Sequence, residues 1–389
     1  MKTLPPLTGK RVLLRADLNL PYHKGAFTDL TRLERLIPTL KWLLEKGARV
    51  LVLSHFGRPK GQDLSLSLAP LAPLMEQLTG QTVRFIPDCV GPQVKAALEG
   101  SESLFLLENV RFYAEEEAGN SDFAKSLAQH ADLYMNDAFS VAHRAHASVV
   151  GITKYLPAYP GLQMHAELAA LEGALNHPER PVAAIVGGSK VSTKLELLMN
   201  LVTKVDTLMI GGGMANTFLK AKGLDVGSSL AELDCVDIVA AIEKQAQAAH
   251  CQILLPCDGS GGENINTSLA SPLIPGQMLS NEKIFDLGPQ SIVHFTQALS
   301  QAKTLIWNGP VGVFEVPPYD QGTTALAQAV AQLTRNGKLI SVAGGGDTVS
   351  ALTHAGVVED LTYVSTAGGA FLEWMEGKTL PGVAALEAQ

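Results

Sequence analysis

The chain alternates short apolar segments with longer segments whose apolar residues recur at helical spacing. In residues 30–47, for example, one helix face would collect Leu33, Leu36, Ile37, Leu40, Leu43 and Leu44. Parallel strands need long crossover connections, which are usually helices, so this alternation predicts an α/β fold with parallel sheets. We expect two Rossmann-like domains, each a parallel sheet of about six strands flanked by helices.

The length of 389 residues exceeds what one hydrophobic core usually supports, which favours two domains. Near the midpoint, residues 155–181 carry turn residues at Pro157, Pro160 and Gly161, then one helical pattern that stops before Pro178. We therefore expect domains at 1–160 and 182–378, joined by a hinge helix over 161–181. The short apolar tail, 379–389, is expected to pack back on the first domain.

Composition narrows the class of protein. At 46% hydrophobic and 17% charged residues the chain resembles an ordinary soluble globular protein, and its net charge of −8 argues against binding nucleic acid. No apolar stretch approaches the roughly 18 residues that would predict a membrane span, and the N-terminus lacks a secretory apolar region. The four cysteines form no CxxC pair and are predicted to be reduced thiols. A cytoplasmic protein with no membrane partner is expected.

Polar residues follow the predicted strands of the first half. The segment 12–14 leads into Arg15, Asp17 and Asn19, and the segment 50–53 leads into His55, Gly57 and Arg58. Parallel sheets bind ligands at the carboxyl ends of their strands, and the guanidinium fork suits carboxylate and phosphate. Five arginines are predicted to converge on a small anion, although each one alone could equally form a surface salt bridge: Arg15, Arg32, Arg58, Arg111 and Arg144.

Glycines follow the predicted strands of the second half, at 187–188, 211–213, 344–346 and 368–369. They allow backbone N–H groups to approach an anion at a helix N-terminus. Lys190 and Lys194 are four residues apart and are expected on one helix face, although they could also be two surface lysines. Neither GxxxxGK[ST] nor GxGxxG occurs.

Two further segments complete the predicted phosphate site. Asp347 and Thr348 are expected at a helix start, where the hydroxyl can meet phosphate and the carboxylate can hold Mg²⁺, unless they only cap the helix. Glu315 could bind ribose hydroxyls, but taken alone it reads more readily as a surface residue. The HRAH segment at 143–146 lacks partners at metal-ligand spacing, so phosphate contact by Arg144 is favoured over a metal site.

These features together predict a phosphoryl-transfer enzyme with two facing lobes. A nicotinamide dehydrogenase is a weaker alternative, because the dinucleotide fingerprint is missing. A two-lobed anion-binding protein that is not an enzyme would leave Lys190 and Asp347 without a role.

A series of motifs runs in order through the chain: RADLNLP, SHFGRP, LLENVRF, NDAFSVAHRAH, GGSKVSTK, IGGGMANTF, WNGPVGVFE, AGGGDT and STAGGAFLEWMEGK. On these motifs the sequence resembles the phosphoglycerate kinase family. The resemblance implies a monomeric two-domain enzyme of glycolysis, a phosphotransferase with a carboxyl group as acceptor. It would transfer phosphate reversibly from 1,3-bisphosphoglycerate to MgADP, giving 3-phosphoglycerate and ATP.

The resemblance also implies roles for single residues. Lys190 and Arg32 would flank the transferred phosphoryl group, Gly368 and Gly369 would form the phosphate-transfer loop, and Asp347 would hold Mg²⁺. The residues implied to bind 3-phosphoglycerate are Asp17, Asn19, Arg32, His55, Phe56, Gly57, Arg58, Arg111 and Arg144. The residues implied to bind the nucleotide are Lys194, Gly211, Gly212, Gly213, Phe285, Asn308, Glu315, Gly345, Gly346, Asp347 and Thr348.

Two positions depart from the family pattern. Ala367 stands where the family usually has a glycine, and we predict that it keeps a negative φ while Gly368 and Gly369 make the close approach to phosphate. The polar, glycine-rich segment 259–268 replaces an apolar strand and is predicted to be a mobile surface loop.

Overall fold

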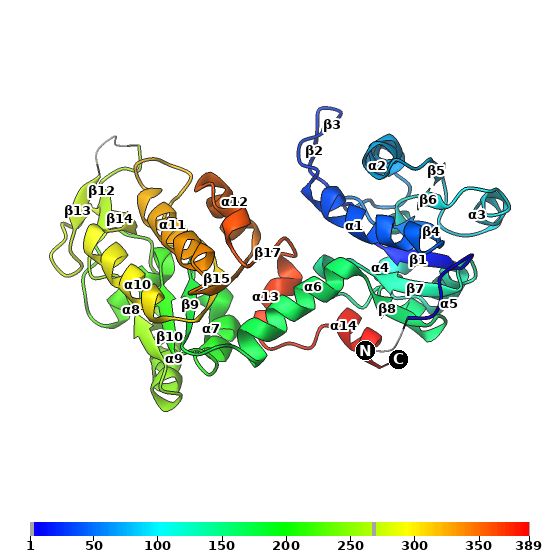
Figure 1. The fold of residues 1–389 in the computed structure, drawn as a ribbon. Helices are drawn as coiled ribbons and strands as arrows, with labels where there is room; N and C mark the ends of the chain where they lie inside the picture. The colour runs from blue at the N-terminus through cyan, green and yellow to red at the C-terminus, as the bar shows by residue number, and fades with distance from the viewer. Residues whose placement is uncertain (1–3, 267–269, 389) are drawn as a thin grey trace. The chain divides into compact units, whose positions relative to one another are not determined.

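The computed structural model describes residues 4–266 and 270–388. By its internal contacts the chain divides into two compact units. The first unit runs to Leu168 and includes the C-terminal segment from Thr379, and the second unit is Ala169–Lys378. Each unit contains a six-stranded sheet flanked by helices, which confirms the predicted α/β fold (Figure 1).

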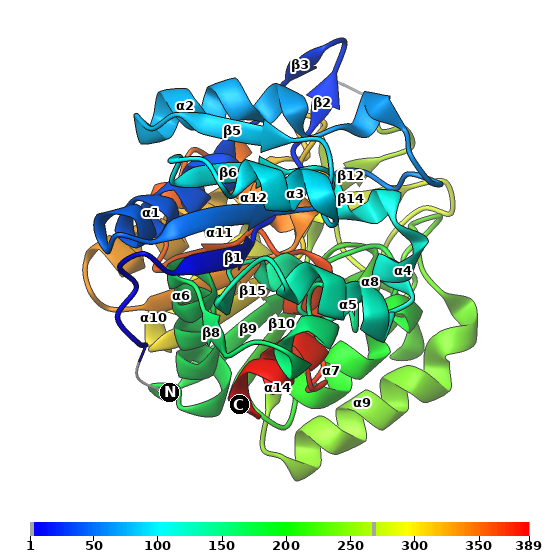
Figure 2. The same ribbon diagram turned by 90° about the vertical axis from the view of Figure 1, so that its right-hand side faces the viewer.

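The sheet of the first unit has the strand order β5-β6-β4-β1-β7-β8, and all its neighbours pair in parallel. Its strands can be followed from β5 through β6 to β1 in Figure 2. Arg15 lies opposite both Leu53 and Asn136 in the register, so the polar residues that follow these strands reach the same edge. The strands are β1 (Arg11–Arg15), β4 (Arg49–Leu53), β5 (Val83–Ile86), β6 (Leu104–Leu107), β7 (Leu133–Asn136) and β8 (Ala158–Pro160).

Alternate residues of the β1 strand supply two separate cores, as the two-residue period of a strand requires. Val12 and Leu14 pack with apolar residues of α1 and α2, whereas Leu13 packs with those of α3 and α5. The helices of this part of the chain are α1 (Thr31–Glu45), α2 (Ala72–Thr79), α3 (Pro92–Ala97), α4 (Ala114–Glu117), α5 (Ser121–Ala128), α6 (Leu162–Leu171) and α14 (Pro381–Glu387). A π-helical turn, η6 (Glu172–Asn176), follows α6.

The sheet of the second unit has the order β11-β10-β9-β15-β16-β17 and is also parallel. The strands are β9 (Val182–Val186), β10 (Thr207–Ile210), β11 (Gln252–Leu254), β15 (Thr304–Asn308), β16 (Ile340–Gly344) and β17 (Tyr363–Ser365). Ile185 and Trp307 pack with residues of α10, α11 and α12, and the buried indole of Trp307 anchors this core. The helices are α7 (Leu195–Leu201), α8 (Gly212–Ala221), α9 (Val236–Ala248), α10 (Pro289–Gln301), α11 (Gln321–Arg335), α12 (Gly346–His354) and α13 (Gly369–Met375).

Two small antiparallel sheets were not expected. The strands β2 (Tyr22–His23) and β3 (Ala26–Phe27) form a hairpin whose turn places Lys24 and Gly25 at positive φ. The strand β12 (Gly259–Gly262) lies between β13 (Ser271–Leu273) and β14 (Lys283–Leu287), so the predicted loop at 259–268 is wrong over its first four residues. Residues 267 and 268 of that prediction lie outside the described residues.

The glycines of β12 are needed for close packing. A Cβ at Gly261 would overlap the carbonyl oxygen of Lys283 on β14, so this strand needs a residue without a side chain. Glycine-rich composition disfavours strands in general, and only the tertiary contact reverses that preference.

Single 3₁₀ turns fill many of the connections: η1 (Leu64–Leu66), η2 (Ala69–Leu71), η3 (Val110–Phe112), η4 (Phe139–Val141), η5 (Gly151–Lys154), η7 (Ser192–Lys194), η8 (Leu233–Cys235) and η9 (Val358–Asp360). All four cysteines are free thiols, as predicted. Within the described ranges, none of the helices combines the length and apolar character that crossing a membrane would require.

Candidate functional site

At the carboxyl end of β1, three predicted site residues meet in the first unit. Arg32 reaches from α1 and donates through Nη1 to the carbonyl oxygen of Asn19 at 2.7 Å, and the same nitrogen lies 3.2 Å from Asp17 Oδ2. Ser140 donates its hydroxyl to Asp17 Oδ2 at 2.6 Å. Burial by itself would raise the pKa of Asp17, but the nearby His55 and Arg32, with the hydrogen bonds from Ser140 and the Asn19 N–H, hold it below its ordinary value. Asp17 is therefore an ionised anchor for the guanidinium.

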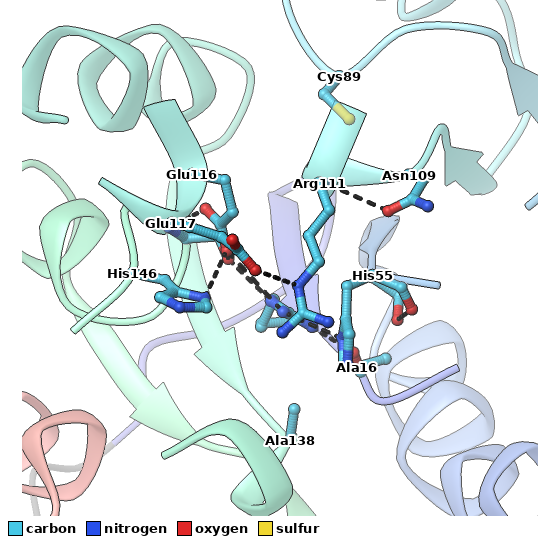
Figure 3. A network of polar contacts seen from close by, with 12 residues as sticks. Ala16, His55, Cys89, Asn109, Arg111, Glu116, Glu117, Ala138 and His146 are labelled. Atoms are coloured by element: carbon cyan, nitrogen blue, oxygen red, sulfur yellow. Dashed lines mark hydrogen bonds and ion pairs between the residues drawn. The ribbon is translucent and has the colours of Figure 1, made fainter. Parts of the chain in front are cut away.

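Residues after β4 and β6 join this cluster. Asn19 Oδ1 accepts the N–H of Gly57 at 2.8 Å, and Arg111 Nη1 donates to the carbonyl oxygen of Gly57 at 2.8 Å. Arg111 Nε also lies 3.2 Å from Glu117 Oε1. Figure 3 marks this contact between the two side chains. A chain of contacts thus connects Asp17, Asn19, Arg32, Gly57 and Arg111.

The other predicted substrate residues differ in exposure. His55 and Phe56 are buried at the end of β4, while the side chains of Arg58 and Arg144 are exposed. Arg144 follows η4, the turn that carries Ser140 and hence a hydrogen bond to Asp17. The structure gives Arg58 and Arg144 the exposure that a contact with a soluble anion requires.

Arg15 was predicted to belong to the anion-binding set, and this is wrong. Its side chain is fully buried, with Nε donating to Ser148 Oγ at 2.8 Å and Nη1 to the carbonyl oxygen of Ala16 at 2.6 Å. The residue lies on the central strand β1, whose two faces are both covered by helices, so its guanidinium forms hydrogen bonds in the protein interior. Four of the five arginines keep exposed or half-buried positions.

A cavity of about 680 Å³ lies in the second unit, at the carboxyl ends of its strands. Gly187 lines the cavity and cannot carry a side chain, because a Cβ there would overlap the carbonyl oxygen of Pro310. The predicted residues that line it are Lys190, Lys194, Gly212, Gly213, Phe285, Glu315 and Asp347. The predicted residues outside its lining are Gly211, Asn308, Gly345, Gly346, Thr348, Gly368 and Gly369.

The two lysines do not share a helix face, contrary to prediction. Lys190 precedes the turn η7, and α7 begins only at Leu195. The intervening turn is held by Glu232, which accepts the Ser192 N–H at 2.9 Å. Both lysines nevertheless line the same cavity.

Lys194 is held inside the cavity wall. Its Nζ donates to the carbonyl oxygen of Gly187 and to Asn308 Oδ1, both at 2.7 Å. Burial lowers the pKa of this ammonium to about 8, and Asp347 opposes the shift. Lys194 is thus positioned firmly, whereas the side chain of Lys190 is exposed.

The Gly344–Thr348 segment turns from β16 into α12. Gly345 has a φ of +100°, which favours glycine, and it packs beside the amide of Asn308. Thr348 Oγ1 donates to the carbonyl oxygen of Gly344 at 2.8 Å and accepts the Gly309 N–H at 2.7 Å. The buried hydroxyl of Thr348 therefore joins two loops, and its contact with phosphate stays a prediction.

The carboxylate of Asp347 is the group that suits a magnesium ion. It is exposed in the first turn of α12 and lines the cavity. Mg²⁺ in phosphate sites usually takes one or two carboxylates and fills its other positions with water and phosphate oxygens. The described residues contain no group of three or more His, Cys, Asp or Glu side chains that would hold a metal ion alone.

The segment after β17 contains the alanine that departs from the family pattern. Among the described residues only Lys24 and His250 combine a side chain with positive φ, so the prediction that Ala367 keeps negative φ is confirmed. Gly368 takes the positive φ, +50°, and α13 begins at Gly369.

The sequence reading missed several groups that shape the two sites. Ser140 and Glu117 orient Asp17 and Arg111, and nothing in their local pattern marks them. Asp258 and Asp286 also line the cavity. Both are acidic residues near strand ends, where the other site residues were predicted, so the same reasoning could have predicted them.

Comparison with known proteins identifies the family. A family model described as "Phosphoglycerate kinase" matches residues 1–378. The phosphoglycerate kinase of Caulobacter vibrioides is 53% identical over 386 residues, covering 98% of each chain. That of Granulibacter bethesdensis is 54% identical over 384 residues, covering 98% of this chain and 97% of the relative.

A solved structure of phosphoglycerate kinase from Coxiella burnetii superposes with a TM-score of 0.91 at 41% identity, covering 99% of this chain and 97% of the other. The family match, the level of identity and the shared fold show that this chain belongs to the phosphoglycerate kinase family and has the phosphoglycerate kinase activity of glycolysis.

Proposed function

We propose that the chain transfers a phosphoryl group reversibly and in line from 1,3-bisphosphoglycerate to MgADP, with one ligand held by each unit. The observation that carries this assignment is the contrast between the two sites. Guanidinium groups gather at the strand ends of the first unit, whereas lysines, glycines and one carboxylate line the cavity of the second.

The first unit is proposed to bind 3-phosphoglycerate. Arg32 and Arg111 are preset by Asp17 and Glu117, so they lose little side-chain freedom when an anion arrives. Exposed Arg58 and Arg144 supply further positive charge. The full proposed set is Asp17, Asn19, Arg32, His55, Phe56, Gly57, Arg58, Arg111 and Arg144.

The second unit is proposed to bind ADP or ATP. Lys194 offers an ammonium at the cavity wall, Glu315 is an exposed carboxylate suited to ribose hydroxyls, and Phe285 gives an aromatic wall. Backbone N–H groups are proposed to contribute from the glycine-rich turns at 211–213, 345–348 and 368–369. The family uses a magnesium nucleotide, and we assign Asp347 as the protein ligand of that ion, which neutralises charge on the phosphate oxygens when bound.

The proposed mechanism needs no general acid. The acyl phosphate is already activated, and its leaving group is a stable carboxylate. Catalysis then consists of positioning and of neutralising charge on the three equatorial oxygens. Lys190, exposed at the cavity rim, and Arg32 are proposed to contact the phosphoryl group as it moves.

In-line transfer requires both bound ligands to meet. We therefore propose that residues 161–181 act as a hinge between domains 1–160 and 182–378, with the tail 379–389 belonging to the first. We further propose that the enzyme works as a monomer in the cytoplasm, with small-molecule ligands and no nucleic-acid or membrane partner.

A coupled assay of ATP formation from 1,3-bisphosphoglycerate and ADP tests the reaction, and failure to form ATP would refute it. The substrate assignment is tested in the reverse direction with Arg58→Ala and Arg144→Ala. Each lost charge-assisted contact is worth roughly 1.5–3 kcal/mol, so KM for 3-phosphoglycerate should rise about ten-fold or more while KM for ATP changes little. Lys125→Ala removes an exposed charge from α5 and serves as the control. An unchanged KM in both arginine variants would contradict the assignment.

A further inference from the structure

We propose that His55 serves the phosphoglycerate site as a neutral hydrogen-bond donor through Nε2, and that Arg15 and Glu116 are the positioning residues that hold it in this form. The inference rests on the proposed place of His55 in that site. It adds the proton position and the buried groups that impose it.

The contact between Arg15 and His55 determines the tautomer. Arg15 Nη2 lies 3.4 Å from His55 Nδ1, beneath the end of β4. A guanidinium stays protonated in proteins and can only donate hydrogen bonds, so Nδ1 must accept. A neutral imidazole carries a single N–H, which is therefore on Nε2.

The surroundings of His55 keep the ring neutral. The side chain is 4% exposed, and burial is the largest influence that lowers its pKa well below the ordinary value. Arg15 at the end of β1, Arg111 on η3 and Arg32 on α1 lower the pKa further, whereas Asp17 opposes them. A cationic His55 would add a further positive charge to a cluster that already contains three arginines.

Glu116 explains why Arg15 stays in place. Both side chains are fully buried, and Arg15 Nη2 lies 4.0 Å from Glu116 Oε1. Ser148 bridges them: it accepts from Arg15 Nε at 2.8 Å and donates its hydroxyl to Glu116 Oε1 at 2.6 Å. Glu116 Oε2 also accepts the Ser148 N–H at 2.8 Å, and Figure 3 shows Glu116 beside His146 in the same network.

The charge of Glu116 is secure. Burial would raise its pKa, but His146, Arg15 and Ser148 outweigh burial and bring the pKa below its ordinary value. A buried guanidinium needs such a partner, because an unpaired buried charge is costly. The chain of contacts thus runs from Glu116 through Arg15 to His55.

The proton position can be read directly by long-range ¹⁵N–¹H correlation spectra of the histidine rings in the full ¹⁵N-labelled chain, without substrate. The His55→Gln spectrum identifies the resonance. We expect the neutral Nε2–H pattern for His55, unchanged from pH 8 to pH 5.5. An Nδ1–H pattern, or a protonated ring at pH 7, would overturn the proposal. Because no substrate is present, this result is independent of whether His55 binds 3-phosphoglycerate.

The positioning role is tested by Arg15→Met and by Glu116→Gln, which remove one partner each. We expect His55 in both variants to show a mixture of tautomers. In Arg15→Met, which removes a positive charge beside the ring, His55 should also titrate at higher pH than in the wild type. If His55 kept the pure Nε2–H form in both, other groups would be fixing the ring and the roles of Arg15 and Glu116 would be refuted.

Kinetics add a test that does not depend on these buried charges. The amide nitrogen of glutamine can replace an Nε2 donor, whereas the shorter asparagine reaches only the position of Nδ1. His55→Gln should raise KM for 3-phosphoglycerate by only a few-fold, and His55→Asn by about ten-fold or more. Equal losses in the two variants, at equal thermal stability, would contradict donation through Nε2.

Discussion

At Lys194, burial favours the neutral amine, whereas a bound phosphate would favour the charged ammonium. With a pKa of about 8, the ammonium begins to lose its charge just above neutral pH, and a bound phosphate would restore the proton. We predict that nucleotide affinity, measured by calorimetry, falls about ten-fold per pH unit above pH 8. Lys194→Arg, which stays charged, should remove this dependence, and an identical pH profile in the variant would contradict the prediction.

The buried carboxyl of Asp286 is expected to make the stability of the protein depend on pH. Its carboxyl is 2% exposed, with Oδ2 accepting the Gly322 N–H at 2.6 Å, and burial raises its pKa to about 7. The folded protein therefore binds a proton that the unfolded chain releases near pH 4, so the stability contributed by this group is present at low pH and is lost as pH rises from about 4 to 7.

We predict that Asp286→Asn stabilises the protein relative to wild type at pH 8, but not at pH 4 to 5. The difference should grow by roughly 1.4 kcal/mol per pH unit within that window, measured by urea unfolding at each pH. An equal effect of the substitution at pH 5 and pH 8 would show that the carboxyl does not titrate in this range.

Ala367 departs from the family pattern, and we expect this departure to cost no stability. Because its φ is already negative, glycine there would relieve no strain and would only increase the entropy of the unfolded chain. Ala367→Gly should lower the free energy of unfolding by roughly 0.4–1 kcal/mol and leave turnover within a few-fold. A gain in stability would mean that the backbone at Ala367 is strained.

At the scale of elements, the small sheet β13-β12-β14 connects a glycine-rich strand to the cavity proposed to bind nucleotide, because Phe285 lies on β14 and lines that cavity. Gly261→Ala would push a methyl group into the Lys283 carbonyl oxygen and should cost about 1–3 kcal/mol of stability, with weaker nucleotide binding. Gly173→Ala is the matched control, since nothing lies within 4 Å of its added Cβ. Comparable losses in the two variants would show that packing at β12 is not limiting.

At the scale of the whole molecule, the proposed reaction requires ligands on two units to meet. We expect small-angle scattering to show a smaller radius of gyration when 3-phosphoglycerate and nucleotide are both present, and little change with either alone. An equal response to a single ligand would contradict a closure that depends on contacts from both.

The sequence was informative where chemistry follows local pattern. Alternating strands and helices predicted both six-stranded parallel sheets. Polar strand ends predicted that Asp17 and Arg111 lie in one cluster, and Arg32 joins it from the start of the first helix, as expected. Topology explains this success, because every parallel strand delivers its next residues to one edge of the sheet. The motif series predicted the family that the comparisons show.

Only the tertiary structure decided what each polar side chain faces. Arg15 and Arg32 look alike in sequence, but one is buried against Glu116 and the other opens toward Asp17 and Asn19. Lys190 and Lys194 do not share a helix face because α7 begins only at Leu195, after a turn that the distant Glu232 contacts. The glycines of β12 form a strand where β14 approaches their backbone. Some of these outcomes depend on partners 40 or more residues away in the sequence. Residue spacing along the chain does not reveal such contacts.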